Sequence, residues 1–472
     1  MQRWQFTAGM AAATVLAAFL VPSIRGDAAA PAPTPTPAAP DGPSPQPPTA
    51  APADGDLLSL TVGLDHASLL RGAPQDRYVV VEVQAAPLPS DVRRPVHLAV
   101  VVDTSGSMSG QGKITHARMA ARELVGLLDD QDTFSLVTFD DRGEVQVAAA
   151  PVTDPARVER AIDGIQPDGG TNLYDGLQLG LQQLRGDAHE GVKRVVLLSD
   201  GQANVGITDA SSLAHLAGSG VSQGVTFSGL GLGLDYNEDL LATMSDAGGG
   251  TYRFVDEPGQ LASLFTEELH QMTALAGRGA TLEVTLPEGV ALQEVYGWDS
   301  ARTADGYQVF MGDIHGGETR KVVARVQVSS DLPDGATLTV ANAALRYTDP
   351  ATEDLLAATA GVAASVTSEA ALVDASLRPE AANLAAQAAS AQYMKDAVVA
   401  YEKGDRAEQK SQLARASELL RVIGHKTGDL GLQEQAADYD ALDAALDTTA
   451  RRSDAGLFEI KKRKEAARAL TR

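Results

Sequence analysis

The sequence of 472 residues contains no cysteine and few aromatic side chains. Without cysteine the chain forms no disulfide bonds, and it offers neither thiolate ligands for zinc or iron–sulfur clusters nor a cysteine nucleophile. Aromatic residues make up 4% of the chain and hydrophobic residues 44%, so we expect cores built mainly from aliphatic side chains. Such cores need no disulfides, and the absence of cysteine is therefore compatible with export. At roughly 150 residues per domain, the length suggests about three domains.

Basic residues are also scarce. Lys and Arg together number 38 against 62 Asp and Glu, which gives a formal net charge of −24 and a pI near 4.7. A chain of this charge repels phosphate backbones and anionic lipids, so we expect no nucleic-acid partner and no binding to a membrane surface. The basic run KKRK at Lys461–Lys464 is interpreted as a solvated helix end rather than a binding patch.

The long apolar run of the chain lies at its N-terminus. Arg3 precedes the apolar stretch Phe6–Val21, and small residues follow at Ala28–Ala30. The run is shorter than the ~20 residues of a membrane span, so residues 1–30 are predicted to be a signal peptide, with an uncleaved anchor as the alternative. Residues 31–54 form an extended linker rich in Pro and Ala. We therefore expect an exported protein, periplasmic, secreted or at the cell surface, which contacts the membrane only through an N-terminal anchor.

The rest of the chain divides by its hydrophobic pattern into four parts: strands in 55–94, alternating strands and helices in 95–276, strands in 280–370 and helices in 376–472. The expected strands of the second part are His97–Val102, Phe134–Phe139, Glu144–Ala149, Arg194–Leu198, Val225–Leu230 and Tyr252–Val255. Strands that alternate with helices predict a Rossmann-like α/β domain, in which helices cover both faces of a central, mostly parallel sheet.

Polar residues with oxygen ligands follow three of these segments. Asp103, Ser105 and Ser107 come directly after an apolar strand, Thr171 begins a helix after a Gly-Gly pair, and Asp200 follows another apolar strand. Ligands of open parallel sheets bind beyond the carboxyl ends of the strands, so we expect these side chains to meet there. Two carboxylates and three hydroxyls suit a hard divalent cation such as Mg²⁺. So few carboxylates would leave the ion positive and able to bind a carboxylate from outside.

At these five residues the sequence resembles the von Willebrand factor type A (VWA) family. The pattern Asp103-x-Ser105-x-Ser107, with Thr171 and Asp200, matches the metal-ion-dependent adhesion site of that family, and the resemblance covers roughly Val96–Leu275. It is specific, because the three elements occur in the right order; the segment GGGTYRFVDEPGQL is typical of bacterial members. The resemblance implies that the five residues hold Mg²⁺, with Mn²⁺ or Ca²⁺ as alternatives, and that Asp200 often acts through water.

The same resemblance implies a protein partner whose Asp or Glu side chain completes the coordination of the ion. A structural turn with helix-capping serines is the alternative explanation of the motif. A phosphatase that uses a nucleophilic Asp needs a second acid where this chain has Ser105, and a serine hydrolase needs its nucleophile where Gly106–Gly110 has Met108. We therefore expect a metal-dependent binding module and no enzyme. The alternatives are an accessory scaffold of an envelope assembly and, less favoured, a Mg²⁺-dependent hydrolase.

The strands on the two sides of the α/β domain, at 57–85 and 281–366, look incomplete alone, and unpaired edges favour aggregation. We expect them to form one β-sandwich with the α/β domain inserted between its strands, similar to integrin β chains and inter-α-trypsin-inhibitor heavy chains. The last helix, Pro258–Leu275, would enter the sandwich through the short connector Ala276–Gly279. In the VWA family rearrangement of the metal site displaces this helix, so the resemblance implies that the connector could act as a hinge; a static sandwich that serves as a stalk is the alternative.

Overall fold

The computed structural model describes residues 57–88, 94–185, 191–233, 236–329, 331, 333–448, 461 and 464, all within the compact unit Gln46–Arg472. The predictions for the signal segment 1–30 and the linker 31–54 lie outside the described residues. Within the described part, every helix is too short or too polar to cross a membrane.

The α/β domain is built on a sheet whose strand order is β6-β5-β4-β7-β8-β9 among the described residues. Its strands are β4 (Val96–Asp103), β5 (Thr133–Phe139), β6 (Gly143–Pro151), β7 (Val192–Ser199), β8 (Val225–Leu232) and β9 (Gly249–Val255). All neighbours are parallel except β6, which pairs with β5 in the antiparallel sense. Every residue of β4 is buried, as a central strand with both faces covered requires.

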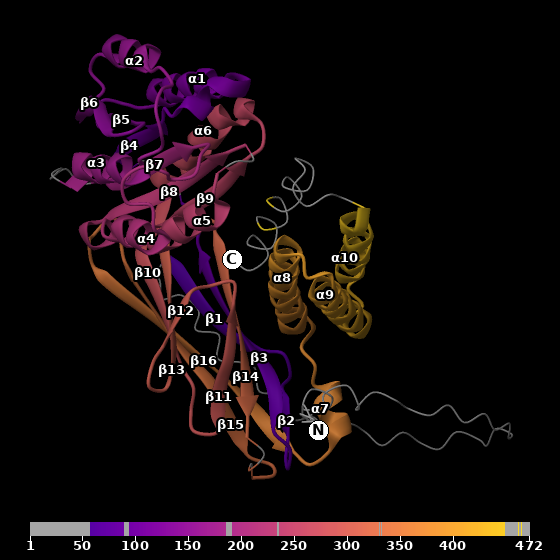
Figure 1. The fold of residues 1–472 in the computed structure, drawn as a ribbon. Coiled ribbons are helices and arrows are strands. Elements are labelled where there is room, and N and C mark those ends of the chain that lie inside the picture. The colour runs from indigo at the N-terminus through magenta and orange to yellow at the C-terminus, as the bar shows by residue number, and fades with distance from the viewer. Residues whose placement is uncertain are drawn as a thin grey trace, which may run out of the picture. The chain divides into compact units, whose positions relative to one another are not determined.

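Helices cover both faces of this sheet (Figure 1). They are α1 (Lys113–Gly126), α2 (Pro155–Gly164), α3 (Leu173–Arg185), α4 (Ala210–Gly218), α5 (Glu238–Ala247) and α6 (Leu261–Thr273), with short 3-10 turns η1 (Gly106–Gly112), η2 (Val221–Gln223) and η3 (Pro258–Gln260). Alternate residues of β4 face opposite ways, because side chains of a strand alternate. Leu98 and Val100 pack with α1 and α6 on one face, and Ala99 and Val101 pack with α3 on the other.

Segments from both sides of the α/β domain share a β-sandwich. One sheet has the order β1-β3-β14-β11, formed by β1 (Leu58–Leu64), β3 (Gln75–Ala85), β14 (Thr319–Val328) and β11 (Val290–Tyr296). The second has the order β12-β13-β10-β15-β16-β2, formed by β12 (Ser300–Arg302), β13 (Gly306–His315), β10 (Leu275–Thr285), β15 (Thr337–Thr348), β16 (Leu355–Thr367) and β2 (Ser68–Leu70). Their inner faces form one core, which is mainly aliphatic. The predicted fold class, an α/β domain inserted in a β-sandwich and followed by helices, is confirmed.

The junction between α6 and the sandwich differs from the prediction. Helix α6 ends at Thr273, and β10 begins at Leu275. The residues Ala276–Gly279, predicted as a separate connector, lie inside β10, where the pairing with β13 shifts register. The prediction of a separate connector is wrong, because the chain enters the sheet as soon as the helix ends. The coupling of helix and sandwich stays a prediction.

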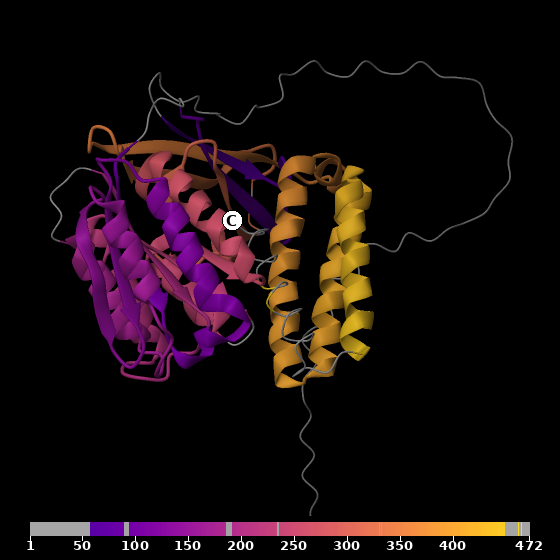
Figure 2. The ribbon, with the colours of Figure 1, turned by 90° about the horizontal axis from the view of Figure 1, so that it is seen from above.

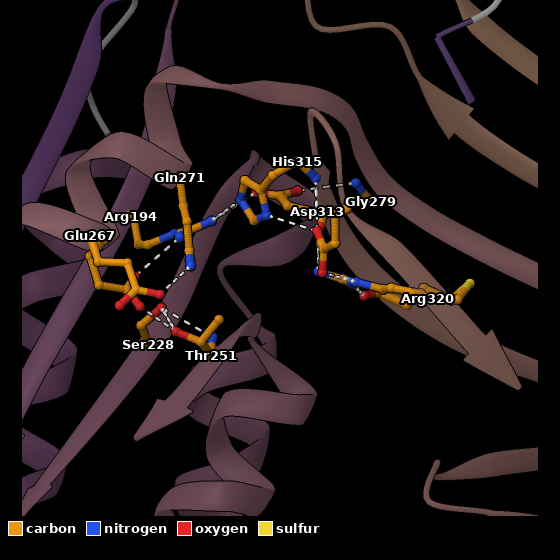
Figure 3. Close-up of polar contacts among 12 residues, drawn as sticks. Arg194, Ser228, Thr251, Glu267, Gln271, Gly279, Asp313, His315 and Arg320 are labelled. Carbon is orange, nitrogen blue, oxygen red and sulfur yellow. Dashed lines mark hydrogen bonds and ion pairs between the residues drawn. The ribbon is translucent and has the colours of Figure 1, made fainter. Parts of the chain in front are cut away.

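A buried ion cluster ties α6 and the sandwich to β7 (Figure 3). Arg194 of β7 is fully buried and donates from Nε to Thr226 Oγ1 over 3.0 Å. Its Nη1 lies 3.2 Å from Glu268 Oε2 of α6, and its Nη2 lies 3.5 Å from Asp313 Oδ2 and 3.4 Å from His315 Nε2, both of β13. We call these five residues the Arg194 cluster. It joins four elements, β7, β8, α6 and β13, near the amino end of β7.

The described C-terminal helices are α7 (Ala370–Ala375), α8 (Pro379–Lys403), α9 (Arg406–Thr427) and α10 (Leu430–Thr448). Helices α8 to α10 run side by side (Figure 2) and share a core. Gly404 and Gly428 end α8 and α9 in the left-handed conformation, and Asp405 caps the start of α9 by accepting from Glu408 N. Alanines of α8 pack against β3 and β14, which small side chains permit at close range.

Two lysines of the basic run near the C-terminus pack against the α/β domain. Lys461 is 3% exposed and donates to Tyr236 O over 2.9 Å and to Glu238 Oε2 over 2.5 Å. Lys464 pairs with Glu238, Asp239 and Glu402. The interpretation of this run as a solvated helix end is therefore wrong for these two residues, because the acidic first turn of α5 provides their partners.

Candidate functional site

The predicted site residues lie at the carboxyl end of the central strands. Asp103 is the last residue of β4, and Asp200 directly follows β7. The two strands are parallel neighbours with Val102 opposite Leu198, so the residues after these positions meet at the same edge of the sheet. Both carboxylates are fully buried.

Hydrogen bonds connect four of the five predicted residues. Ser107 Oγ donates to Asp200 Oδ1 over 2.7 Å, and the hydroxyls of Ser105 and Ser107 lie 3.0 Å apart. Asp103 accepts from Ser105 N over 2.8 Å and from Ser199 Oγ over 2.5 Å. The two aspartates are thus held in fixed orientations by the loop that carries the serines and by the end of β7.

The fifth predicted residue, Thr171, faces the same space. A methyl group placed on Gly201 would lie 3.2 Å from Thr171 Oγ1, 3.7 Å from Ser107 Oγ and 3.8 Å from Asp103 Oδ2. The hydroxyls and a carboxylate therefore converge beside Gly201. The structure brings all five predicted residues together.

The loop that carries Thr171 is fixed by neighbours outside the predicted set. Asn204 Oδ1 accepts from Thr171 N, and Asp141 Oδ1 accepts from Gly170 N, each over 2.8 Å. Gly106 N also donates to Gly169 O over 3.1 Å, which ties this loop to the serine loop. These contacts come from segments distant in the sequence, and no local sequence pattern predicts them.

Sequence reasoning also missed Lys113. Its Nζ lies 2.6 Å from Asp200 Oδ2, and its side chain is 7% exposed. Lys113 is the first residue of α1, where a positive charge opposes the helix dipole. That unfavourable placement, ten residues after Asp103, is the signal that could have identified it.

Burial shapes the electrostatics of the site. Desolvation raises the pKa of Asp103 to about 6, although hydrogen bonds from Ser199 and Ser105 favour the charged form, and the charge of Asp200 raises it further. Keeping Asp103 ionised therefore costs free energy, which a nearby cation would offset.

The residues present fit a hard divalent cation. Two carboxylates and three hydroxyls provide oxygen ligands only, which is the donor set that Mg²⁺ prefers. The space they share beside Gly201 would be narrowed by any side chain at that position, since its Cβ would approach Thr171 Oγ1 to 3.2 Å. Both the donors and the space are what a small oxygen-liganded ion requires.

Comparisons with known proteins agree with this geometry. The model of the von Willebrand factor type A domain matches residues 98–202. An uncharacterized protein of Synechocystis sp. is 26% identical over 62% of this chain and 71% of its own length. Inter-alpha-trypsin inhibitor heavy chain H4 of Homo sapiens is 31% identical over a segment that covers 38% of this chain and 20% of that relative.

Solved structures share the fold over most of the chain. A von Willebrand factor type A structure from Catenulispora acidiphila has a TM-score of 0.63 at 20% identity and covers 81% of this chain and 91% of its own. The ArnB paralog VWA2 from Sulfolobus acidocaldarius has a TM-score of 0.57 at 17% identity and covers 88% and 99%. The α/β domain of this chain is therefore a von Willebrand factor type A domain.

Proposed function

We propose that the VWA domain binds Mg²⁺ at its strand ends and that the ion captures an Asp or Glu side chain of a partner protein, with the ligands Asp103, Ser105, Ser107, Thr171 and Asp200. The observation that supports this is the convergence of oxygens of Thr171, Ser107 and Asp103 beside Gly201, with Ser105 and Asp200 in hydrogen-bond contact with Ser107. VWA domains commonly mediate protein–protein interaction. Mn²⁺ and Ca²⁺ are the alternative ions, since they also take oxygen ligands.

Neighbouring groups orient the proposed oxygen ligands, and only two of these five ligands carry a negative charge. Ser199 and the amide of Ser105 hold Asp103, while Ser107 and Lys113 hold Asp200. The other donors are neutral hydroxyls. The two carboxylates would balance the formal charge of a bound Mg²⁺, but five ligands from this chain would leave one of its roughly six octahedral positions open. That position could take a carboxylate from a partner, and the ammonium group of Lys113 beside Asp200 adds a positive charge to the site.

The proposal treats the chain as a binding protein. A Mg²⁺-dependent hydrolase is the alternative that a screen on generic phosphoesters and esters tests, and turnover that disappears in Asp103→Ala would favour it. The N-terminal segment 1–30 supports an exported location for the partner as well, in the periplasm, at the cell surface or outside the cell.

The first experiment measures binding of the ion through stability. We expect Mg²⁺ to raise the melting temperature of the full chain, because a ligand at a concentration 100 times its Kd adds ~2.7 kcal/mol to the free energy of unfolding. Asp103→Ala should abolish the shift. Asp163→Ala is the matched control, because it removes an exposed carboxylate of α2. A normal shift in Asp103→Ala would show that the ion binds elsewhere.

The second experiment concerns the partner. A pull-down from an envelope extract, performed with Mg²⁺ and with EDTA, should retain the partner only with Mg²⁺. Replacing the partner's critical acid by its amide should weaken the complex as EDTA does. A partner held equally well in EDTA would show that another surface makes the contact.

A further inference from the structure

Lys113 places a positive charge within the candidate metal centre. Its Nζ lies 2.6 Å from Asp200 Oδ2, and the exposed fractions of the two side chains are 7% and 0%. The other oxygen of Asp200 accepts from Ser107. A single buried carboxylate is therefore shared between a proposed metal ligand and an ammonium group of the same chain.

The position of this lysine is unfavourable apart from its pairing. Burying an ammonium group is costly unless it is paired, and a cation in the first turn of a helix opposes the helix dipole. The turn before α1 uses two consecutive residues with positive φ, Gln111 at 51° and Gly112 at 70°, and this conformation is uncommon for Gln. The ion pair with Asp200 is the interaction that offsets these costs.

The end of the lysine side chain is also confined. A methyl group on Gly233, the residue after β8, would lie 3.6 Å from both Cε and Nζ of Lys113. Gly233 itself has φ of 78°, which favours glycine. The ammonium group therefore lies between the end of β8 and Asp200.

The positive charge of Lys113 and that of a bound divalent ion would compete for the same carboxylate. The contacts of the described residues bring two carboxylates, Asp103 and Asp200, and one ammonium to the same sheet edge. A divalent ion and Lys113 would draw on the same aspartate, and like charges a few ångströms apart repel strongly in a partly buried site. The lysine therefore acts on the ion as both competitor and repelling neighbour.

We infer that Lys113 is a positioning residue that acts as a built-in counter-cation: it stabilises the site through Asp200 and lowers the affinity of the site for divalent ions. The inference rests on the proposed function. Its consequence is that Lys113 sets the Mg²⁺ concentration at which the site fills and the partner is captured.

The test uses the full chain and Mg²⁺ alone, with the neutral variants Lys113→Met and Lys113→Gln. The Gln variant keeps a hydrogen-bond donor for Asp200 and is the one that remains informative if the Met variant does not fold. We expect Mg²⁺ to bind both at least about tenfold more tightly than the wild type, because a nearby unit charge is removed. In EDTA their melting temperatures should be several degrees lower, because the buried carboxylate of Asp200 loses its positively charged partner.

Arg122→Met is the matched control, because it removes a positive charge from the same helix, where Arg122 pairs with Asp163 at the surface. It should change neither the affinity nor the melting temperature appreciably. A Mg²⁺ affinity of Lys113→Gln equal to that of Arg122→Met, or weaker than that of the wild type, would overturn the inference and leave the metal proposal standing. A wild-type chain that does not respond to Mg²⁺ would overturn both.

Discussion

Strand β7 has a cluster of buried charges at each end, and the two clusters differ in how completely their charged groups are paired. Near its amino end, the guanidinium of Arg194 finds partners for Nε, Nη1 and Nη2 in Thr226, Glu268, Asp313 and His315. Just after its carboxyl end, Asp200 accepts from Ser107 and pairs with Lys113, whereas Asp103 accepts from Ser199 and from the backbone amide of Ser105.

This difference distinguishes a structural cluster from the proposed binding site. The Arg194 cluster joins β7, α6 and β13, so the groups that satisfy its charge hold two parts of the fold together. At the other end, oxygens of Asp103, Ser107 and Thr171 converge on one space beside Gly201. Buried charges are tolerated when they are paired, and donors that converge on a common point are arranged for a further partner.

The largest expected effect comes from breaking the balanced cluster. Arg194→Met leaves Glu268 and Asp313 without their cation in a buried setting, which should cost about 3–5 kcal/mol of the free energy of unfolding. Urea unfolding measures the loss. Arg194 does not contact the proposed metal ligands, so molecules that remain folded should keep the expected shift of melting temperature with Mg²⁺.

The control for this variant is Arg253→Met. Arg253 pairs at the surface with Glu267, which lies in α6 next to Glu268 of the Arg194 cluster. Exposed pairs contribute about 1 kcal/mol or less, so the control should be nearly neutral. Equal losses of the free energy of unfolding in the two variants would show that the buried ion pairs of Arg194 stabilise the fold no more than an exposed pair does.

The sequence predicted the α/β fold and the candidate ligands for the same physical reason. Apolar runs of strand length mark β4 and β7, and parallel strands bring the residues after them to one edge. Asp103 and Asp200 could therefore be placed together before any contact was known. The pair Gly169-Gly170 marked the loop before Thr171 as the third segment of the predicted site.

The groups that tune the site could not be predicted in this way. Lys113, Ser199 and Asn204 act through contacts that depend on how loops fold over the strand ends. The Arg194 cluster likewise depends on partners 32 to 121 residues away. The basic run containing Lys461 has the same sequence whether it is solvated or packed on an acidic helix start, so composition alone could not decide.

A smaller effect should come from pH at the edge of the Arg194 cluster. Burial alone would raise the pKa of Glu318, but the hydrogen bond from His315 and the charge of Arg320 outweigh it and lower the pKa from 4.5 to about 2. A carboxyl whose pKa is lowered by folding stabilises the fold above its unfolded pKa and loses this contribution as the pH falls towards the folded value.

We therefore expect the wild type to lose about 1–2 kcal/mol more than Glu318→Gln between pH 5 and pH 2, after allowance for partial exposure. Urea unfolding at several pH values in this window measures the difference in slope. Glu353→Gln, which removes an exposed carboxylate paired with Arg278, should leave the slope unchanged. Parallel slopes in the wild type and Glu318→Gln would contradict the pairing with His315 and Arg320.

The smallest effect on stability should come from Thr171→Ala, and its comparison with Thr251→Ala gives the sharpest contrast between the clusters. Thr171 Oγ1 faces the space beside Gly201, whereas the hydroxyl of Thr251 donates to Glu268 of the Arg194 cluster. Thr171→Ala removes a neutral donor, so we expect a change of less than about 1 kcal/mol in EDTA and a clearly weaker response to Mg²⁺. Thr251→Ala removes a hydrogen bond to a charged group, which should cost about 1.5–3 kcal/mol and leave the Mg²⁺ response intact. Melting curves of both variants in EDTA and across a Mg²⁺ titration compare the two ends of β7 with one chemical change. If both variants lost stability without any change in the Mg²⁺ response, Thr171 would be a structural residue, and the division between the two clusters would fail at that position.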